Sequence, residues 1–96
     1  MTHSTDPVVV VLSEVTKLLA ASHASDWAAL TPSEVIAIIE RETTTLIQSG
    51  RFQNKGELAS LFAPTAEIQE ISIANHWSSD YMRLSQAFDE AARNIS

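Results

Sequence analysis

The stretch from Phe62 to Trp77 constrains the fold of this chain more than any other. Pro64 disfavours helical geometry in the residue before it, so the preceding helix has to end there. Thr65 then supplies an N-cap for a new helix, and Asn75 is suited to a left-handed helix end. These signals predict a helix over about residues 66–77, and we expect it to be the packing centre of the chain.

Two longer helices are expected before this stretch. Asp6-Pro7 places an N-cap and a first-turn proline ahead of a periodic apolar face, which predicts a helix over about residues 7–22. A Thr-Pro-Ser-Glu sequence at residues 31–34 is a capping box with proline at the first helical position. Gly50 provides the stop for the helix that follows, over about residues 32–49. Its apolar residues cover more than one stripe, so we expect it to contact neighbours on two sides.

Shorter signals complete the pattern. Asn54 is placed to cap a short helix that ends before the proline, and Ser78-Ser79-Asp80 caps the last helix. An apolar stripe runs through that last helix to the C-terminus. The segment from Ser25 to Leu30 is expected to form a short helical turn that inserts Trp27 into the core. The stripe of the last helix consists of Tyr81, Leu84, Phe88, Ala91, Ala92 and Ile95.

Composition favours an all-α fold. The chain has only two glycines and three prolines, too few for the many turns of a sandwich or barrel. We therefore predict a single helical domain over residues 1–96, with about five helices, three long and two short, and with residues 1–5 frayed. The alternative is an α+β fold with strands near residues 8–12 and 68–73, where β-branched side chains are frequent.

Net charge and the search for targeting signals predict the kind of partner and the localisation of the protein. The net charge is −6, with twelve acidic and six basic residues. This balance disfavours nucleic acid, which requires clustered Lys and Arg, and it permits a basic protein partner. The longest apolar run, Val8 to Leu12, is far shorter than a membrane span, and no secretory signal is visible. With no cysteine in the chain, we expect a cytoplasmic protein without membrane association.

One alternative function is transcriptional regulation through a helix-turn-helix unit. Residues 57–62 resemble the first helix of such a unit, and the helix from Ala66 onward occupies the place of the recognition helix. However, residues 66–77 contain Glu67 and Glu70 and no Lys or Arg, so nothing there is suited to phosphate or guanine. Two helices joined by a short connection explain the spacing better.

The sequence contains no motif that indicates a catalytic or metal-binding site. The three histidines show no paired spacing, and there is no nucleophile elbow, phosphate loop or dinucleotide motif. We therefore predict no enzyme, no cofactor and no metal site. His76, beside Trp77, is expected to be a hydrogen-bonded structural histidine, whereas Glu40 and Glu42 are expected on solvated faces.

The remaining hypothesis is a protein-interaction surface. In the helix over residues 66–77, Ile73 and Trp77 project roughly opposite to Ile68, so the helix is apolar on two sides. Such a helix is either buried between others or carries a partner surface, and a homodimer satisfies both conditions. We predict a non-catalytic interaction domain that binds a basic protein partner or its own copy, in a toxin-neutralising or adaptor role. Its predicted partner-binding residues are Ile73, Trp77, Tyr81, Glu67 and Glu70.

Overall fold

The computed structural model describes residues 6–64 and 66–95, and this part of the chain contains helices and no strands. The all-α prediction is therefore confirmed, and the α+β alternative is wrong for both proposed strands. The expected fraying of residues 1–5 and the expected cap at Thr65 lie outside the described residues. The helices are α1 (Pro7–Ala20), α2 (Pro32–Ser49), α3 (Lys55–Leu61), α4 (Glu67–Ala74) and α5 (Ser78–Ala92).

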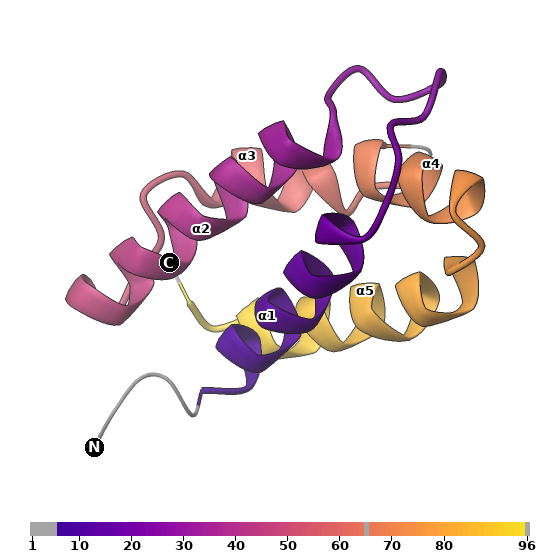
Figure 1. Cartoon of the computed structure of the whole chain (residues 1–96). Helices are drawn as coiled ribbons and strands as arrows, with labels where there is room; N and C mark the ends of the chain where they lie inside the picture. Colours follow the sequence, from indigo (N-terminus) through magenta and orange to yellow (C-terminus); the bar gives the residue numbers. More distant parts are fainter. Residues whose placement is uncertain (1–5, 65, 96) are drawn as a thin grey trace.

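The helices pack around α1 and α2. Helix α1 contacts both α2 and α5, and Figure 1 shows it lying between them. Helix α2 also contacts α3 and α4, in agreement with the broad apolar surface of its sequence. Helix α4 in turn packs on α5, so the chain closes into one bundle with a continuous core. The largest fully buried side chains include Leu12, Leu19, Ile39, Leu46, Leu58, Ile68, Ile71 and Leu84.

Helix α1 forms in spite of its run of four valines. Val8, Leu12 and Val15 are at most 1% exposed and face the core together with Leu19, at the spacing of a helix. The small cost of β-branched residues in a helix is offset because this face is buried against two neighbouring helices. Val10 points the other way and is 48% exposed.

The capping box of α2 forms as the sequence predicts. The backbone N–H of Glu34 donates to Thr31 Oγ1 at 3.2 Å, and the N–H of Thr31 donates to Glu34 Oε1 at 2.8 Å. The hydrogen bond from the Thr31 backbone N–H lowers the pKa of the Glu34 carboxyl, and a hydrogen bond with the Thr31 hydroxyl lowers it further to a smaller extent. At the other end, Gly50 adopts φ 81°, the left-handed conformation that glycine tolerates without strain.

Glu42 is buried, which corrects the expectation of a solvated face. Its side chain is 0% exposed, and its two oxygens accept hydrogen bonds from the backbone N–H groups of Gln53 and Asn54 at 2.8 and 3.1 Å. Arg41 also donates to it, at 2.7 Å from Nη2, and extends to Glu57 on α3. A buried carboxylate is tolerated when it is hydrogen-bonded in this way, and this one fastens the α2–α3 loop to α2.

A lysine joins the start of α3 to the C-terminal end of α5. Lys55 Nζ, at the start of α3, donates to the carbonyl oxygen of Ala92 at 2.8 Å and to that of Ile95. These carbonyls lie at the C-terminus of α5, where the helix dipole favours a cation. A contact between residues far apart in sequence thus fixes the last turn of the chain.

The turn between α4 and α5 differs from the sequence prediction by one residue. Asn75 is not left-handed; His76 is, with φ 65°. The N–H of Trp77 bonds to the Ser72 carbonyl at 2.9 Å, and that of His76 bonds to the Ile73 carbonyl at 3.3 Å. This is a Schellman ending, so α4 stops at Ala74 instead of continuing to residue 77. The reversal turns Trp77 back toward the core, where it starts α5 as the N-cap residue without a side-chain cap.

Candidate functional site

The predicted partner-binding residues fall into two groups. Trp77 and Tyr81 are 7% and 3% exposed and belong to the core, whereas Ile73 is 52% exposed on α4. Glu67 and Glu70 are half-buried on the same helix. The structure therefore separates Ile73 from Trp77, which the sequence had placed on one helix face. Of the two alternatives for this side of the helix, burial between other helices and a partner surface, the exposure of Ile73 excludes the first within the described chain.

Tyr81 is held in the core by its hydroxyl group. Tyr81 Oη donates to the Phe62 carbonyl at 2.8 Å, next to the stacked rings of Phe62 and Phe88, whose centroids are 4.3 Å apart. Burial raises the pKa of the Tyr81 hydroxyl, an effect that a hydrogen bond with Ser85 opposes in part. A satisfied buried tyrosine of this kind supports packing and is not available to a partner.

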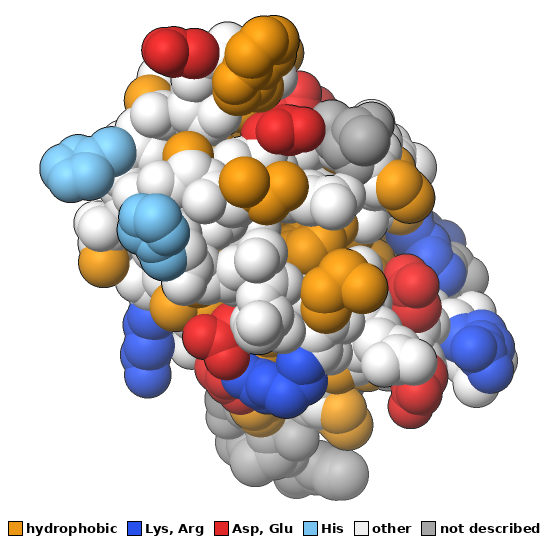
Figure 2. Space-filling view, turned by 90° about the vertical axis from the view of Figure 1, so that its right-hand side faces the viewer, with side chains coloured by type: hydrophobic (Ala, Val, Ile, Leu, Met, Phe, Trp, Pro, Cys, Tyr) orange, Lys and Arg blue, Asp and Glu red, His pale blue; other side chains and the backbone are white. Residues whose placement is uncertain are grey.

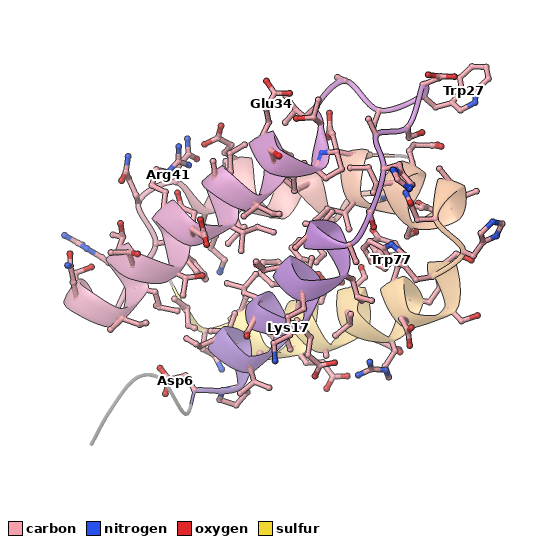
Figure 3. The ribbon with its side chains drawn as sticks, viewed as in Figure 1. Asp6, Lys17, Trp27, Glu34, Arg41 and Trp77 are labelled. Carbon is pink, nitrogen blue, oxygen red and sulfur yellow. The ribbon has the colours of Figure 1, made fainter. Side chains whose placement is uncertain are left out.

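Trp27 is the residue that the sequence prediction misplaced most. It does not enter the core: it is 85% exposed, the largest exposure of any large hydrophobic side chain in residues 6–64 and 66–95. Figure 3 shows that Trp27 points away from the bundle at the outer bend of the α1–α2 loop, while Trp77 lies inside the bundle. The turn around Trp27 does form, because the Ala28 N–H bonds to the Ser25 carbonyl at 3.2 Å.

The loop that carries Trp27 is fastened to α4 and α5 at its start. The Asn75 side chain accepts from the His23 N–H and donates to the His23 carbonyl, both at 2.8 Å. Trp77 Nε1 donates to Ser22 Oγ at 2.9 Å. The Trp27 N–H itself bonds to Ser25 Oγ at 3.2 Å, and Ser25 is buried. The exposed indole is thus carried by a backbone with specific hydrogen bonds.

Trp27 and Ile73 share one concavity of about 310 Å³. We call its lining the Trp27–Ile73 surface. It combines an indole and small apolar side chains with two carboxylates, and it joins the α1–α2 loop to the exposed side of α4. Its residues are Ala24, Ser25, Asp26, Trp27, Glu70, Ile73 and Ala74.

The charge around this surface has one sign. Asp26 and Glu70 line the concavity, and Glu67 lies one helical turn before Glu70. Figure 2 shows acidic and hydrophobic side chains together in the upper part of this face, and the Lys and Arg side chains visible in this view lie lower. An exposed apolar patch with an acidic rim is typical of a surface that meets a cationic partner.

A larger concavity of about 520 Å³ lies between α1 and α2. Its walls carry Lys17, Glu40 and several hydroxyl groups, but Thr16 and Thr43 already donate to the carbonyls of Leu12 and Ile39, four residues earlier in each helix. The exposed large hydrophobic side chains of the described residues do not line it. We therefore take the Trp27–Ile73 surface as the candidate site.

The histidines do not form a site in the described residues. His23 and His76 are both exposed, so the side chain of His76 does not have the structural place beside Trp77 that the sequence led us to expect. Its role is conformational, because it supplies the left-handed residue that ends α4. Within residues 6–64 and 66–95, no group of three or more His, Asp or Glu side chains is arranged to hold a metal ion.

Comparisons of the chain with protein family models, with curated proteins and with solved structures give no significant match. Among the helices described above, none is both long and apolar enough to cross a membrane.

Proposed function

We propose that this protein is a non-catalytic interaction module that binds a basic protein partner through the Trp27–Ile73 surface. The observation that carries the proposal is the exposed pair Trp27 and Ile73, which share a concavity with two carboxylates. Large aromatic side chains that exclude water are the usual anchors of protein interfaces, and a charged rim steers the partner toward them. Neutralisation of a basic enzyme and docking of a basic adaptor segment both fit this chemistry.

The charges favour a different protein over a second copy of this chain. In a two-fold symmetric dimer built on this surface, each residue would face the same patch of its partner. Asp26 and Glu70 of one copy would then approach Asp26 and Glu70 of the other. Like charges brought together at an interface oppose association, whereas Lys and Arg side chains would neutralise them.

The exposed side of α4 also weighs against the alternative of a DNA-reading helix. In the described structure, α4 presents Ile73 together with the half-buried Glu67 and Glu70, and its sequence contains no Lys or Arg. Acidic side chains at this position would repel the phosphate backbone. A protein surface with positive charge is the better complement.

Site-specific photo-crosslinking in cells tests the proposal. A photoreactive amino acid replaces Ile73 in one variant and Met82 in a matched control, since Met82 is also exposed, at 64%, but lies outside the Trp27–Ile73 surface. We expect position 73 to capture a protein with positive net charge that position 82 does not capture. Crosslinks only to a second copy of this chain, or the same products from both positions, contradict the proposal.

Binding of the captured protein, once purified, provides a quantitative test. Ile73→Ser should weaken its affinity by about tenfold or more, because it removes an apolar contact without adding a charge. Met82→Ser makes the same kind of change elsewhere and should have little effect. The affinity should also fall as salt rises, because exposed charges are screened. Equal losses in the two variants would show that the surface is not the binding site.

A further inference from the structure

The Trp27–Ile73 surface has a chemical pattern that is more specific than a general acidic patch. Its lining combines an indole that is 85% exposed with small or aliphatic side chains such as Ala74 and Ile73. Asp26 and Glu70 approach the same concavity from two elements, the α1–α2 loop and α4. At about 310 Å³, the concavity lies at the lower end of small-molecule pockets and suits a single long side chain better than a helix.

From this arrangement we infer that the concavity binds an arginine side chain of the partner, with its guanidinium stacked on Trp27 and paired with Asp26 and Glu70. The inference rests on the proposed function, and it names the group that the surface recognises. The methylene stem of the arginine would lie over Ile73 and replace water on its apolar side chain.

Arginine fits this site better than lysine for three reasons. Its guanidinium is planar, so it stacks on an indole face while its edge N–H groups remain free to bond to carboxylates. Its five donors allow it to pair with two carboxylates at once, and Asp26 and Glu70 both line the concavity. The guanidinium is also more weakly hydrated than an ammonium group, so removing water from it when it binds costs less free energy.

The backbone geometry supports the same inference. The turn that presents Trp27 is closed by hydrogen bonds to Ser25, and the Asn75 side chain anchors His23, two residues before Ser25, to the end of α4. A loop that is ordered before binding loses less conformational entropy when the ligand arrives. The structure therefore combines an exposed indole, which the fold itself does not bury, with a support that holds it in place.

Short peptides test the inference without knowledge of the partner. The full chain, labelled with nitrogen-15, is titrated with acetylated and amidated tetra-arginine, tetra-lysine and tetra-glutamate peptides, and the indole N–H of Trp27 is followed by NMR. We expect the tetra-arginine peptide to shift this signal and to bind about threefold or more tightly than tetra-lysine. Tetra-glutamate should leave it unchanged. Equal affinities for the arginine and lysine peptides, or no shift of the Trp27 signal, overturn the inference.

Matched variants separate the indole from general electrostatics. In Trp27→Ala, where the indole signal is absent, binding is followed by the backbone N–H signal of Ile73; the variant should bind tetra-arginine about fivefold more weakly and lose the advantage over tetra-lysine. The double change Asp26→Asn with Glu70→Gln should weaken both peptides. The control, Asp89→Asn with Glu90→Gln, removes the same charge from an exposed part of α5 and should leave binding of both peptides nearly unchanged. Equal losses from the two double variants would mean that only net charge matters, which overturns the inference.

The two proposals fail in different ways. If tetra-arginine does not perturb Trp27 but the crosslinked partner still depends on Ile73, the arginine assignment is wrong and the proposed function stands. If tetra-arginine binds as expected but position 73 captures no basic protein, the cation site is real and the proposed function is wrong. Circular dichroism of each variant establishes that it is folded before its binding is compared.

Discussion

The middle of α2 and the loop that precedes this helix differ in which side chains they bury. Near the middle of α2, the bundle buries a carboxylate, Glu42, and surrounds it with hydrogen-bond donors. Beyond its N-terminus, the α1–α2 loop exposes a tryptophan, Trp27, with no cover from the rest of the described chain. Figure 3 shows the separation, with Arg41, the sequence neighbour of Glu42, near the middle of α2 and Trp27 at the outer bend of the loop.

This contrast indicates that the surroundings of Glu42 stabilise the fold, whereas the loop around Trp27 is available to another molecule. A buried charge is costly unless its partners are present, and the partners of Glu42 are all supplied by the chain itself. An exposed indole forgoes the stabilisation that burial would give it. The backbone of Trp27 is hydrogen-bonded while its side chain stays exposed, so the apolar surface of the indole remains accessible to another molecule.

The largest expected effect concerns the other tryptophan. Trp77→Ala should lower the free energy of unfolding by about 3–5 kcal/mol, because it leaves a cavity in the core and removes the bond to Ser22. Trp77→Phe keeps most of the apolar volume and should cost about 1–2 kcal/mol. Urea denaturation followed by circular dichroism measures both. A loss below 1 kcal/mol for Trp77→Ala would contradict its place in the core.

Glu42→Ala should have the next largest effect. The substitution leaves the N–H groups of Gln53 and Asn54 without their acceptor and creates a void, and we expect a loss of about 2–3 kcal/mol. Glu42→Gln retains an acceptor oxygen and the shape, so it should lose less, about 1 kcal/mol. Hydrogen exchange at Gln53 and Asn54 should accelerate in the alanine variant. Unchanged exchange at both amides would show that Glu42 does not fasten the loop.

Loss of the capping box at the N-terminus of α2 should have a smaller effect on stability. Thr31→Ala should lower the free energy of unfolding by about 1 kcal/mol, measured as a shift in the denaturant midpoint. No shift would mean that the cap makes no contribution.

Glu34 adds a dependence on pH to the same capping box. Its pKa is lowered in the folded state, so the native carboxylate stabilises the fold above the unfolded value of 4.5, and this stabilisation is lost as the pH falls through the folded pKa. Glu34→Gln keeps an acceptor at this position without a titrating group. Wild type should therefore lose more stability than Glu34→Gln between about pH 5 and pH 3. Parallel losses in the two proteins would contradict the assignment.

The smallest effect on stability belongs to Trp27. Trp27→Ala should change the free energy of unfolding by no more than about 0.5 kcal/mol, because the side chain has few contacts to lose. Paired with the large loss expected for Trp77→Ala, this gives a direct measure of the contrast between the two tryptophans. A loss above 2 kcal/mol for Trp27→Ala would show that its indole serves the fold, and the contrast would collapse.

Local signals in the sequence predicted most of the helix boundaries. The capping box at residues 31–34, the stop at Gly50 and the cap at Asn54 each depend on neighbours within a few residues, and each forms as expected. The end of α4 was displaced because Asn75 and His76 are both tolerated in the left-handed conformation. Asn75 is instead engaged with His23, a contact across the fold that local preference does not include.

The candidate site was only partly predictable. Ile73, Glu67 and Glu70 were found because helical periodicity shows when an apolar side chain lies opposite the buried face. Trp27 and Asp26 were missed because residues 21–31 have no periodicity, and a tryptophan in such a loop is expected to be buried. Helical periodicity places Trp77 on the same face as Ile73 only if the helix continues to residue 77, whereas α4 ends at Ala74.

By itself, the sequence determined that this chain is helical, where most helices begin and end, and which face of each one is apolar, because these properties arise within one or two helical turns. Only the tertiary structure decided which tryptophan is buried and which is exposed. That choice depends on the path of the loop, and the loop is fastened by bonds such as that between Trp77 and Ser22, which join residues more than fifty positions apart. The stretch from Phe62 to Trp77 supplies Ile68, Ile71 and Trp77 to the core, and only the fold brings its one exposed isoleucine, Ile73, beside Trp27.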